Sequence, residues 1–366
     1  MLAMHPHPAK VRPRMNIDVK LLSRICEAPG APGAEKSIRD LVLAELKGLA
    51  DHVETDNMGN VIALKKGRSS AQKTMAAAHM DEIGFIVTHI TDDGFVRFNP
   101  VGGFDPKTLT SQRVIIHGKK DVPGVMGSKP IHIMQPDERN KAMKLGDYFI
   151  DTGMSGDALR KLVEVGNFIT RYSPLMEFGD CVNAKSLDNR ASVYVLLECL
   201  RELKKSKRKP AYDFHAAFTV QEEVGLRGAL AAALRVQPDF GIGLDTTIAY
   251  DVPGSTPQER CTRLTHGAAI KLMDSSVICD YRMIEFMKRT AKKHSIKWQP
   301  EILAAGGTDT ANLQRMVAGG SIAGAISVPT RHIHQTIETC NKADLAACVE
   351  LLAACVCEID KHDWKH

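Results

Sequence analysis

Helix-like and strand-like stretches alternate along the C-terminal half of this 366-residue chain, and this alternation constrains the fold more than any other feature. Apolar residues at helical spacing are followed by short apolar runs that are typical of buried strands. The helical stretches are "NRASVYVLLECLRELKK", "LRGALAAALR", "YRMIEFMKRTAKKH" and "KADLAACVELLAACVCEI", and the strand-like runs between them are "DFHAAFTV", "FGIGLD" and "SIAGAISV". Strands that alternate with helices form a mostly parallel sheet with helices on both faces. The sequence therefore predicts an α/β fold.

A segment of different character interrupts this pattern. Residues 84–175 contain short apolar stretches, such as "GFIVTHI" and "GVMG", separated by turns that are rich in Gly, Pro and Asp. Regularly spaced short strands of this kind are typical of a small β-rich domain. We therefore predict a discontinuous α/β domain made of residues 16–83 and 176–366, an inserted β-barrel-like domain over 84–175, and a loose N-terminal tail over 1–15.

Composition and charge exclude several classes of function. The chain is 44% hydrophobic and 25% charged, as in ordinary soluble globular proteins. Its formal net charge of +5 is small and only 5% of its residues are aromatic, so we expect no nucleic-acid partner. Apolar runs are too short to cross a membrane. The nine cysteines are odd in number and form no Cys-x-x-Cys pair, a pattern that indicates reduced thiols and a cytoplasmic location.

Histidine, aspartate and glutamate residues follow the predicted strands one after another. They are His79, Asp81, Glu222, Glu223, Asp245 and His334, and Asp188 immediately precedes the long helix. Each has an ordinary explanation when taken alone: a helix N-cap for Asp188, a structural hydrogen bond for each histidine, and a solvated acidic pair at 222–223. Ligands of open α/β sheets bind beyond the carboxyl ends of the strands. The coincidence of these side chains at strand ends therefore favours one shared site.

Two imidazoles with several carboxylates match a site for two divalent ions such as Zn²⁺, Co²⁺ or Mn²⁺. Asp81 lies two residues after His79, so on an extended segment it shares a side with His79 and can hold the second nitrogen of that imidazole. One member of the Glu222–Glu223 pair is then free to act as a base on a metal-bound water.

Six stretches of the chain resemble, in order, the motifs of the M42 metallo-aminopeptidases, a family that includes the glutamyl aminopeptidases and the tetrahedral TET peptidases. They are "AAAHMDEIGFIV", "SLDNRASVYVLLECL", "TVQEEVGLRGA", "GLDTTIAYDVPG", "GGTDTANLQ" and "PTRHIHQTIE". The resemblance implies a phosphorylase/hydrolase-like catalytic domain that acts on peptides from their N-terminus. It also implies that His79 and Asp245 bind one ion, that Glu223 and His334 bind the other, and that Asp188 bridges the two.

The resemblance further implies that Glu222 is the general base on a metal-bridging water and that Asp81 orients His79. It implies that the inserted domain mediates self-association into dimers, which associate further into a particle of about twelve chains. Gln335 departs from the family, which usually has serine after the last ligand histidine. Asp309 in "GGTDT" has two explanations, a substrate contact or the N-cap of the helix that follows.

Other classes of function remain open at this point. A related co-catalytic metal hydrolase, such as a carboxypeptidase or an N-acyl amino acid deacylase, would use the same ligands. A glucanase is a weaker alternative, because it needs two carboxyl groups about 5–9.5 Å apart and gives the two histidines no purpose. A non-catalytic relative of the family would have lost a ligand or the base, and every one of these residues is present here.

Overall fold

The computed structural model describes residues 15–366 and contains a large sheet of eleven strands. The strands of this sheet are β1 (His52–Thr55), β2 (Val61–Lys65), β3 (Ser69–His79), β10 (Met176–Phe178), β11 (Cys181–Ala184), β12 (Tyr212–Thr219), β13 (Phe240–Ile248), β14 (Ala268–Met273), β15 (Trp298–Ile302), β16 (Ile322–Arg331) and β17 (Glu338–Asn341). Their order is β1-β2-β12-β3-β13-β16-β17-β11-β10, and β14 pairs with β15 and β16 beside this path.

The centre of the sheet is parallel, as the alternation of helices and strands predicts. β12 pairs in parallel with β3, β3 with β13, and β13 with β16. The flanking strands differ from the expectation: β2 runs antiparallel to β12, and β17 runs antiparallel to both β16 and β11. Because the parallel strands point the same way, their carboxyl ends meet at one edge of the sheet.

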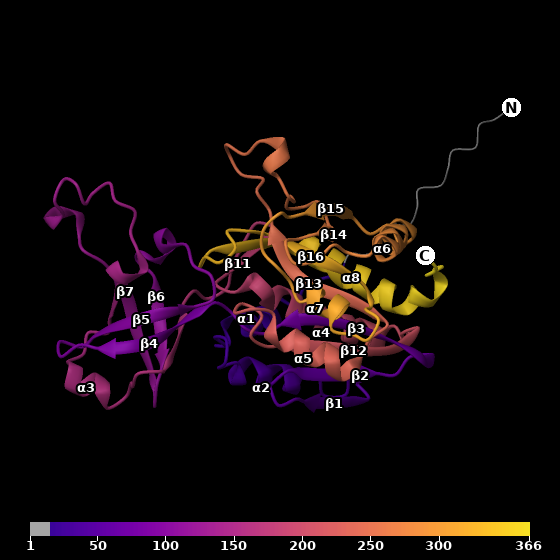
Figure 1. Cartoon of the computed structure of the whole chain (residues 1–366), viewed down its shortest axis with the longest axis horizontal. Helices are drawn as coiled ribbons and strands as arrows, with labels where there is room; N and C mark the ends of the chain where they lie inside the picture. The colour runs from indigo at the N-terminus through magenta and orange to yellow at the C-terminus, as the bar shows by residue number, and fades with distance from the viewer. Residues whose placement is uncertain (1–14) are drawn as a thin grey trace.

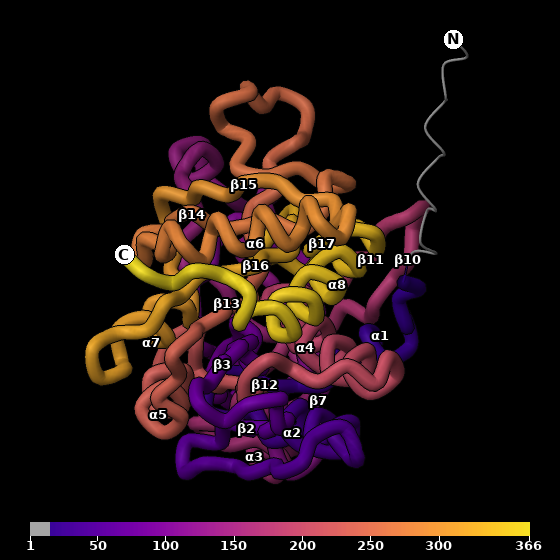
Figure 2. Tube along the Cα trace, turned by 90° about the vertical axis from the view of Figure 1, so that its right-hand side faces the viewer, coloured from indigo at the N-terminus to yellow at the C-terminus, as the bar shows by residue number. Residues whose placement is uncertain are grey.

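Helices cover both faces of the sheet, because the central strands are apolar on both sides. The helices of this unit are α1 (Val19–Glu27), α2 (Lys36–Glu45), α4 (Leu187–Lys205), α5 (Arg227–Val236), α6 (Tyr281–Lys293), α7 (Thr310–Arg315) and α8 (Lys342–Glu358). Ala76 and Ala78 of β3 lie in a core that includes residues of α1, α4 and α8. Met75 and Ala77 point the other way, into a core with residues of α5 and α7. Figure 2 shows α8 beside α4 and α6.

A closed barrel of six strands lies at one end of the α/β unit (Figure 1). Its strands are β4 (Gly84–Ile90), β5 (Phe95–Val101), β6 (Arg113–His117), β7 (Asp121–Gly127), β8 (Phe149–Asp151) and β9 (Phe168–Arg171), with the short helix α3 (Gly156–Arg160) beside them. Phe85 and Val87 from "GFIVTHI" and Met126 from "GVMG" are buried in the barrel's own core. These side chains are therefore covered within the chain itself.

Three further observations concern the ends and the thiols of the chain. Residues 1–14 of the predicted loose tail lie outside the described residues, whereas Met15 is half-buried against the core of the α/β unit. All nine cysteines carry free thiols, and seven of them are buried. Among residues 15–366, no helix has both the length and the apolar character needed to cross a bilayer.

Candidate metal centre

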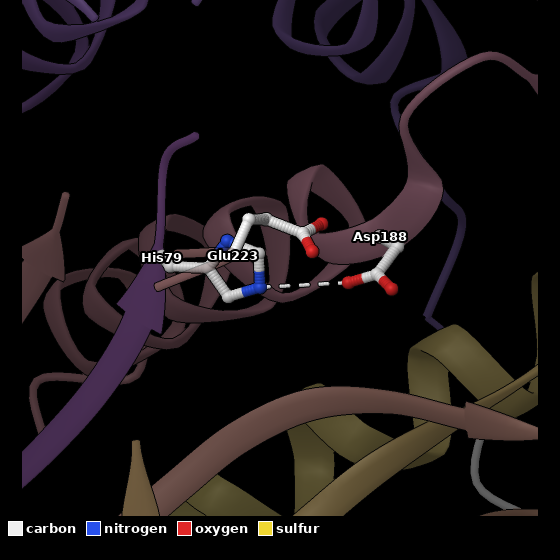
Figure 3. Close-up of side chains that lie close together, drawn as sticks. All are labelled: His79, Asp188 and Glu223. Atoms are coloured by element: carbon white, nitrogen blue, oxygen red, sulfur yellow. Dashed lines mark ion pairs between the residues drawn. The ribbon is translucent and has the colours of Figure 1, made fainter. Parts of the chain in front are cut away.

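The predicted site residues lie together at the carboxyl ends of the parallel strands, although Asp245 lies within β13 and does not follow it as expected. His79 is the last residue of β3, and its Nε2 atom lies 3.4 Å from Asp188 Oδ1 at the start of α4. The same Nε2 atom lies 3.7 Å from Glu222 Oε2 and 3.8 Å from Asp245 Oδ1. We call the space between these four side chains the first ion position. Figure 3 shows His79 facing Asp188, with Glu223 beside them.

A second cluster shares Asp188 with the first. The Nε2 atom of His334 lies 3.4 Å from Asp188 Oδ2 and 3.2 Å from Glu223 Oε2. We call the space between these three side chains the second ion position. Asp188 therefore directs Oδ1 to one imidazole and Oδ2 to the other, the arrangement that a carboxylate needs to bridge two ions.

The backbone leaves regular geometry where these side chains converge. Asp188 lies inside the range of α4 but has φ −78° and ψ 106°, and the N-cap of this helix is Ser186. Both carboxylate oxygens of Asp188 face imidazoles and not the N–H groups of the helix that follows, so the N-cap explanation is wrong. Gln221 has φ +54° and His334 has φ +65°, conformations that cost non-glycine residues about 1–3 kcal/mol each. The turn at Gln221 ends the alternation of the strand, so Glu222 and Glu223 both reach the site.

Asp81 holds the glutamate pair in place through the main chain. Its Oδ1 atom accepts a hydrogen bond from the backbone N–H of Glu222 at 3.0 Å, and its Oδ2 atom accepts one from Glu223 at 3.1 Å. These bonds could not be foreseen from the sequence, because they join the segment after β3 to a turn 141 residues further along the chain. Asp81 also lies next to His79: Nδ1 of the imidazole is 3.1 Å from the main-chain oxygen of Asp81 and 3.5 Å from Oδ1.

Buried negative charge dominates the electrostatics of the site. Burial acts to lower the pKa of His79, but the carboxylates of Glu222, Asp188 and Asp81 raise it well above its usual value. For His334, burial is likewise outweighed by the Glu223 and Asp188 carboxylates, which raise its pKa to about 11. Burial raises the pKa of Glu222 well above its usual range. The cluster therefore attracts cations, and a divalent ion would compete with these protons.

The donor atoms fit divalent transition metals. One donor atom each from His79, Asp188 and Glu223 lie within 4.8 Å of one another, and so do atoms from His79, Glu222 and Asp245. Ligands about 2.0–2.2 Å from a tetrahedral ion lie about 3.3 Å from each other, close to the distances between these side chains. Among residues 15–366, the Oε1 atom of Glu223 is buried without a hydrogen-bond partner, as expected of an atom that faces an ion.

Two buried carboxylates near the site have contacts that sequence analysis did not foresee. Asp309 occupies the N-cap position of α7, as one of the two explanations expected, but its side chain makes no capping hydrogen bond; its Oδ2 atom accepts one from Thr219 Oγ1 at 2.5 Å. Burial raises the pKa of Asp309 to about 6. Glu338 accepts hydrogen bonds from the backbone N–H groups of Asp188 and His334. Glu338 was not among the predicted site residues, because its bond to Asp188 joins positions 150 residues apart.

An α/β sheet with two imidazoles and several carboxylates clustered at the carboxyl ends of its parallel strands, joined to a closed barrel, defines the class of this protein as a metal-dependent hydrolase. The family model described as M42 glutamyl aminopeptidase matches residues 59–351. The chain belongs to this family of metal-dependent peptidases.

Known members of the family cover nearly the whole chain. The lysyl aminopeptidase of Pyrococcus furiosus is 31% identical over 95% of this chain and 99% of its own length. The TET aminopeptidase from the marine sediment archaeon Thaumarchaeota archaeon SCGC AB-539-E09 superposes with a TM-score of 0.90 at 33% identity, covering 93% and 96% of the two chains. The TET1 peptidase of Pyrococcus horikoshii, which can assemble into a tetrahedron or a large octahedral shell, has a TM-score of 0.82 at 30% identity over 93% and 99%.

Proposed function

We propose that this aminopeptidase binds two divalent ions per chain and removes single residues from the N-terminus of short peptides. The observation that carries the proposal is the place of Asp188, whose two carboxylate oxygens each lie 3.4 Å from a different imidazole nitrogen. A single ion bound by Asp188 would need only one of these two oxygens. Zn²⁺ and Co²⁺ suit the mixed imidazole and carboxylate donors best, and Mn²⁺ is also compatible with them.

The side chains divide the work of binding the ions. His79 and Asp245 would hold the ion at the first position, Glu223 and His334 would hold the ion at the second position, and Asp188 would contact both. When bound, such ions lower the pKa of water and polarise the carbonyl group of the scissile peptide bond. Asp81 would fix the orientation of His79 and the backbone of both glutamates.

Glu222 would move the proton in this reaction. Its buried carboxylate lies at the first ion position, and burial raises its pKa well above its usual range, which makes it a stronger base than an exposed glutamate. Glu222 takes a proton from the attacking water, and the hydroxide oxygen forms a bond to the peptide carbonyl carbon. The C–N bond then breaks, and the same proton passes from Glu222 to the leaving amine.

The nature of the substrate separates this proposal from its alternatives. We expect peptides with a free N-terminal amine to be shortened one residue at a time, whereas the same peptides with an acetylated N-terminus should react poorly. The measurement is mass spectrometry of timed digests by the Zn²⁺- or Co²⁺-loaded protein. Shortening from the carboxyl end would indicate a carboxypeptidase, efficient removal of the acetyl group would indicate a deacylase, and hydrolysis of β-glucan would indicate a glucanase.

The barrel is the part of the chain that we assign to self-association. Val125 is 49% exposed and Tyr172 is 52% exposed, and both line an open groove of about 680 Å³ on the outside of the barrel. The related TET1 peptidase can assemble into a tetrahedron or a large octahedral shell, which supports self-association, and we propose that this chain forms dimers that associate further into a dodecamer. The nine free thiols support a cytoplasmic location, where glutathione and thioredoxin keep cysteines reduced.

Light scattering on the purified protein tests the assembly. We expect a mass of about twelve chains, and we expect Val125→Glu, which puts a charge into the apolar groove, to reduce that mass. Val165→Glu is a control at another exposed apolar position that does not line the groove. A wild-type protein that is monomeric and fully active would contradict the proposed role of the barrel.

A further inference from the structure

A fully buried carboxylate outside the proposed ligand set connects two of the ligands. Glu338 is the first residue of β17 and has no exposed surface. Its Oε2 atom accepts a hydrogen bond from the backbone N–H of Asp188 at 2.9 Å, and its Oε1 atom accepts one from His334 at 2.8 Å. We propose that Glu338 is a positioning residue that sets the geometry of the second ion position, an inference that rests on the metal-dependent function proposed above.

Neither of its two partners is held by regular secondary structure. Asp188 departs from helical geometry within α4, and His334 lies in the turn between β16 and β17 with a positive φ of 65°. Their side chains nevertheless have to meet, because Oδ2 of Asp188 and Nε2 of His334 lie 3.4 Å apart. Because the two oxygens of one buried carboxyl group accept both main-chain N–H groups, Glu338 fixes these two segments, as a helix or strand would otherwise do.

Glu338 is itself rigidly placed. It pairs with Ala184 in the antiparallel ladder between β11 and β17, and its main-chain oxygen accepts a hydrogen bond from the Asn183 side chain at 3.1 Å. Asp81 plays the matching part for the glutamate pair, since its two oxygens accept the backbone N–H groups of Glu222 and Glu223. Two buried carboxylates thus hold four residues of the site by their main chains.

Glutamine at position 338 would break this arrangement with little change of shape. Its amide oxygen can accept one of the two hydrogen bonds, but its NH₂ group would face the other N–H donor. One backbone segment, at Asp188 or at His334, would then lose its acceptor and shift. Because outer residues of this kind typically change metal affinity by about 10–100-fold, we expect a loss of that size for one of the two ions.

Asp344 offers a matched control in the same chain. It is 1% exposed, in α8, and its oxygens accept hydrogen bonds from the backbone N–H groups of Thr265 and Gly267, both at 2.6 Å. Asp344→Asn therefore removes the same kind of double acceptor from a turn that carries none of the proposed ligands. Both substitutions should lower the melting temperature, and only Glu338→Gln should change metal binding.

The experiment is a calorimetric titration of Zn²⁺ into the chelator-stripped full chain, with the absorption spectrum of the Co²⁺-loaded protein as a second readout. We expect the wild type and Asp344→Asn to bind two ions with the same affinities. In Glu338→Gln, one of the two ions should bind about 10–100-fold more weakly, and only this variant should have an altered Co²⁺ spectrum. Peptide hydrolysis by Glu338→Gln should recover as Zn²⁺ is raised, which a general loss of fold would not allow.

The possible outcomes separate the two proposals. A wild-type protein that binds no ions overturns the metal-dependent function and the role of Glu338 with it. A wild type and a Glu338→Gln variant that bind two ions with equal affinities overturn only the positioning role. If Glu338→Gln does not fold, Glu338→Asp takes its place, because it keeps the carboxyl group and shortens the side chain by one methylene group. Unchanged metal affinities in that variant likewise overturn the positioning role.

Discussion

Replacing Glu222 with glutamine should lower kcat by about 10²–10⁴-fold, the usual cost of removing a general base, while both ions stay bound. Glutamine is nearly isosteric with glutamate, and the backbone N–H of residue 222 can still donate to Asp81. The change therefore removes the ability to accept a proton and little else. The measurement is steady-state hydrolysis of a dipeptide at saturating substrate, together with metal analysis of the same preparation.

Glu223→Gln is the matched control, because it changes the adjacent residue in the same way. Oε2 of Glu223 lies 3.2 Å from His334 Nε2, at the second ion position. We expect this variant to bind one of the two ions more weakly and to regain activity as the metal concentration is raised. A Glu222→Gln variant within a few-fold of the wild-type kcat would remove Glu222 from the role of base. If Glu222→Gln instead loses an ion, Glu222 is the metal ligand and Glu223 is the general base.

The fold was predictable where the sequence has long periodic elements. The run from α4 to α8 alternates apolar helices and strands, so the parallel centre and the helices on both faces follow from the sequence. The antiparallel flank was not predictable, because β10, β11 and β17 are only 3 or 4 residues long. Strands so short carry too few side chains to show a period, and their pairing depends on neighbours distant in sequence.

The candidate site was predictable for a related reason. His79, Glu222 and Asp245 stand at or near the ends of parallel strands, and the rule that ligands bind there needs only the order of elements. The contacts that hold the site residues in place could not be predicted from the order of elements. Glu338 is joined to Asp188 across 150 residues, and the carboxylate of Asp309 bonds to Thr219 although its position suggests a helix cap. Local sequence cannot distinguish such contacts from ordinary capping or pairing.

Substitution of Asp188 should have the broadest effect on metal binding of any single change at the site. Its Oδ1 and Oδ2 atoms each lie 3.4 Å from a different imidazole, and burial of this carboxylate is outweighed by the two histidines, which hold its pKa below its usual range. Asparagine has the same size but is neutral and presents only one oxygen. We therefore expect Asp188→Asn to bind both ions more weakly, each by more than the roughly 10–100-fold that outer residues control.

Metal analysis after dialysis against limiting Zn²⁺ tests this expectation. His334→Ala should lose one ion and keep the other, because His334 lies at the second ion position only. Asp280→Asn is the control for loss of an acidic side chain elsewhere; it breaks an ion pair with Arg282 at the start of α6 and should keep both ions. Two fully occupied positions in Asp188→Asn would show that the carboxylate does not bridge. Loss of a single ion would assign the Asp188 carboxylate to one ion position only. The two ions would then be held by the remaining side chains without a shared ligand.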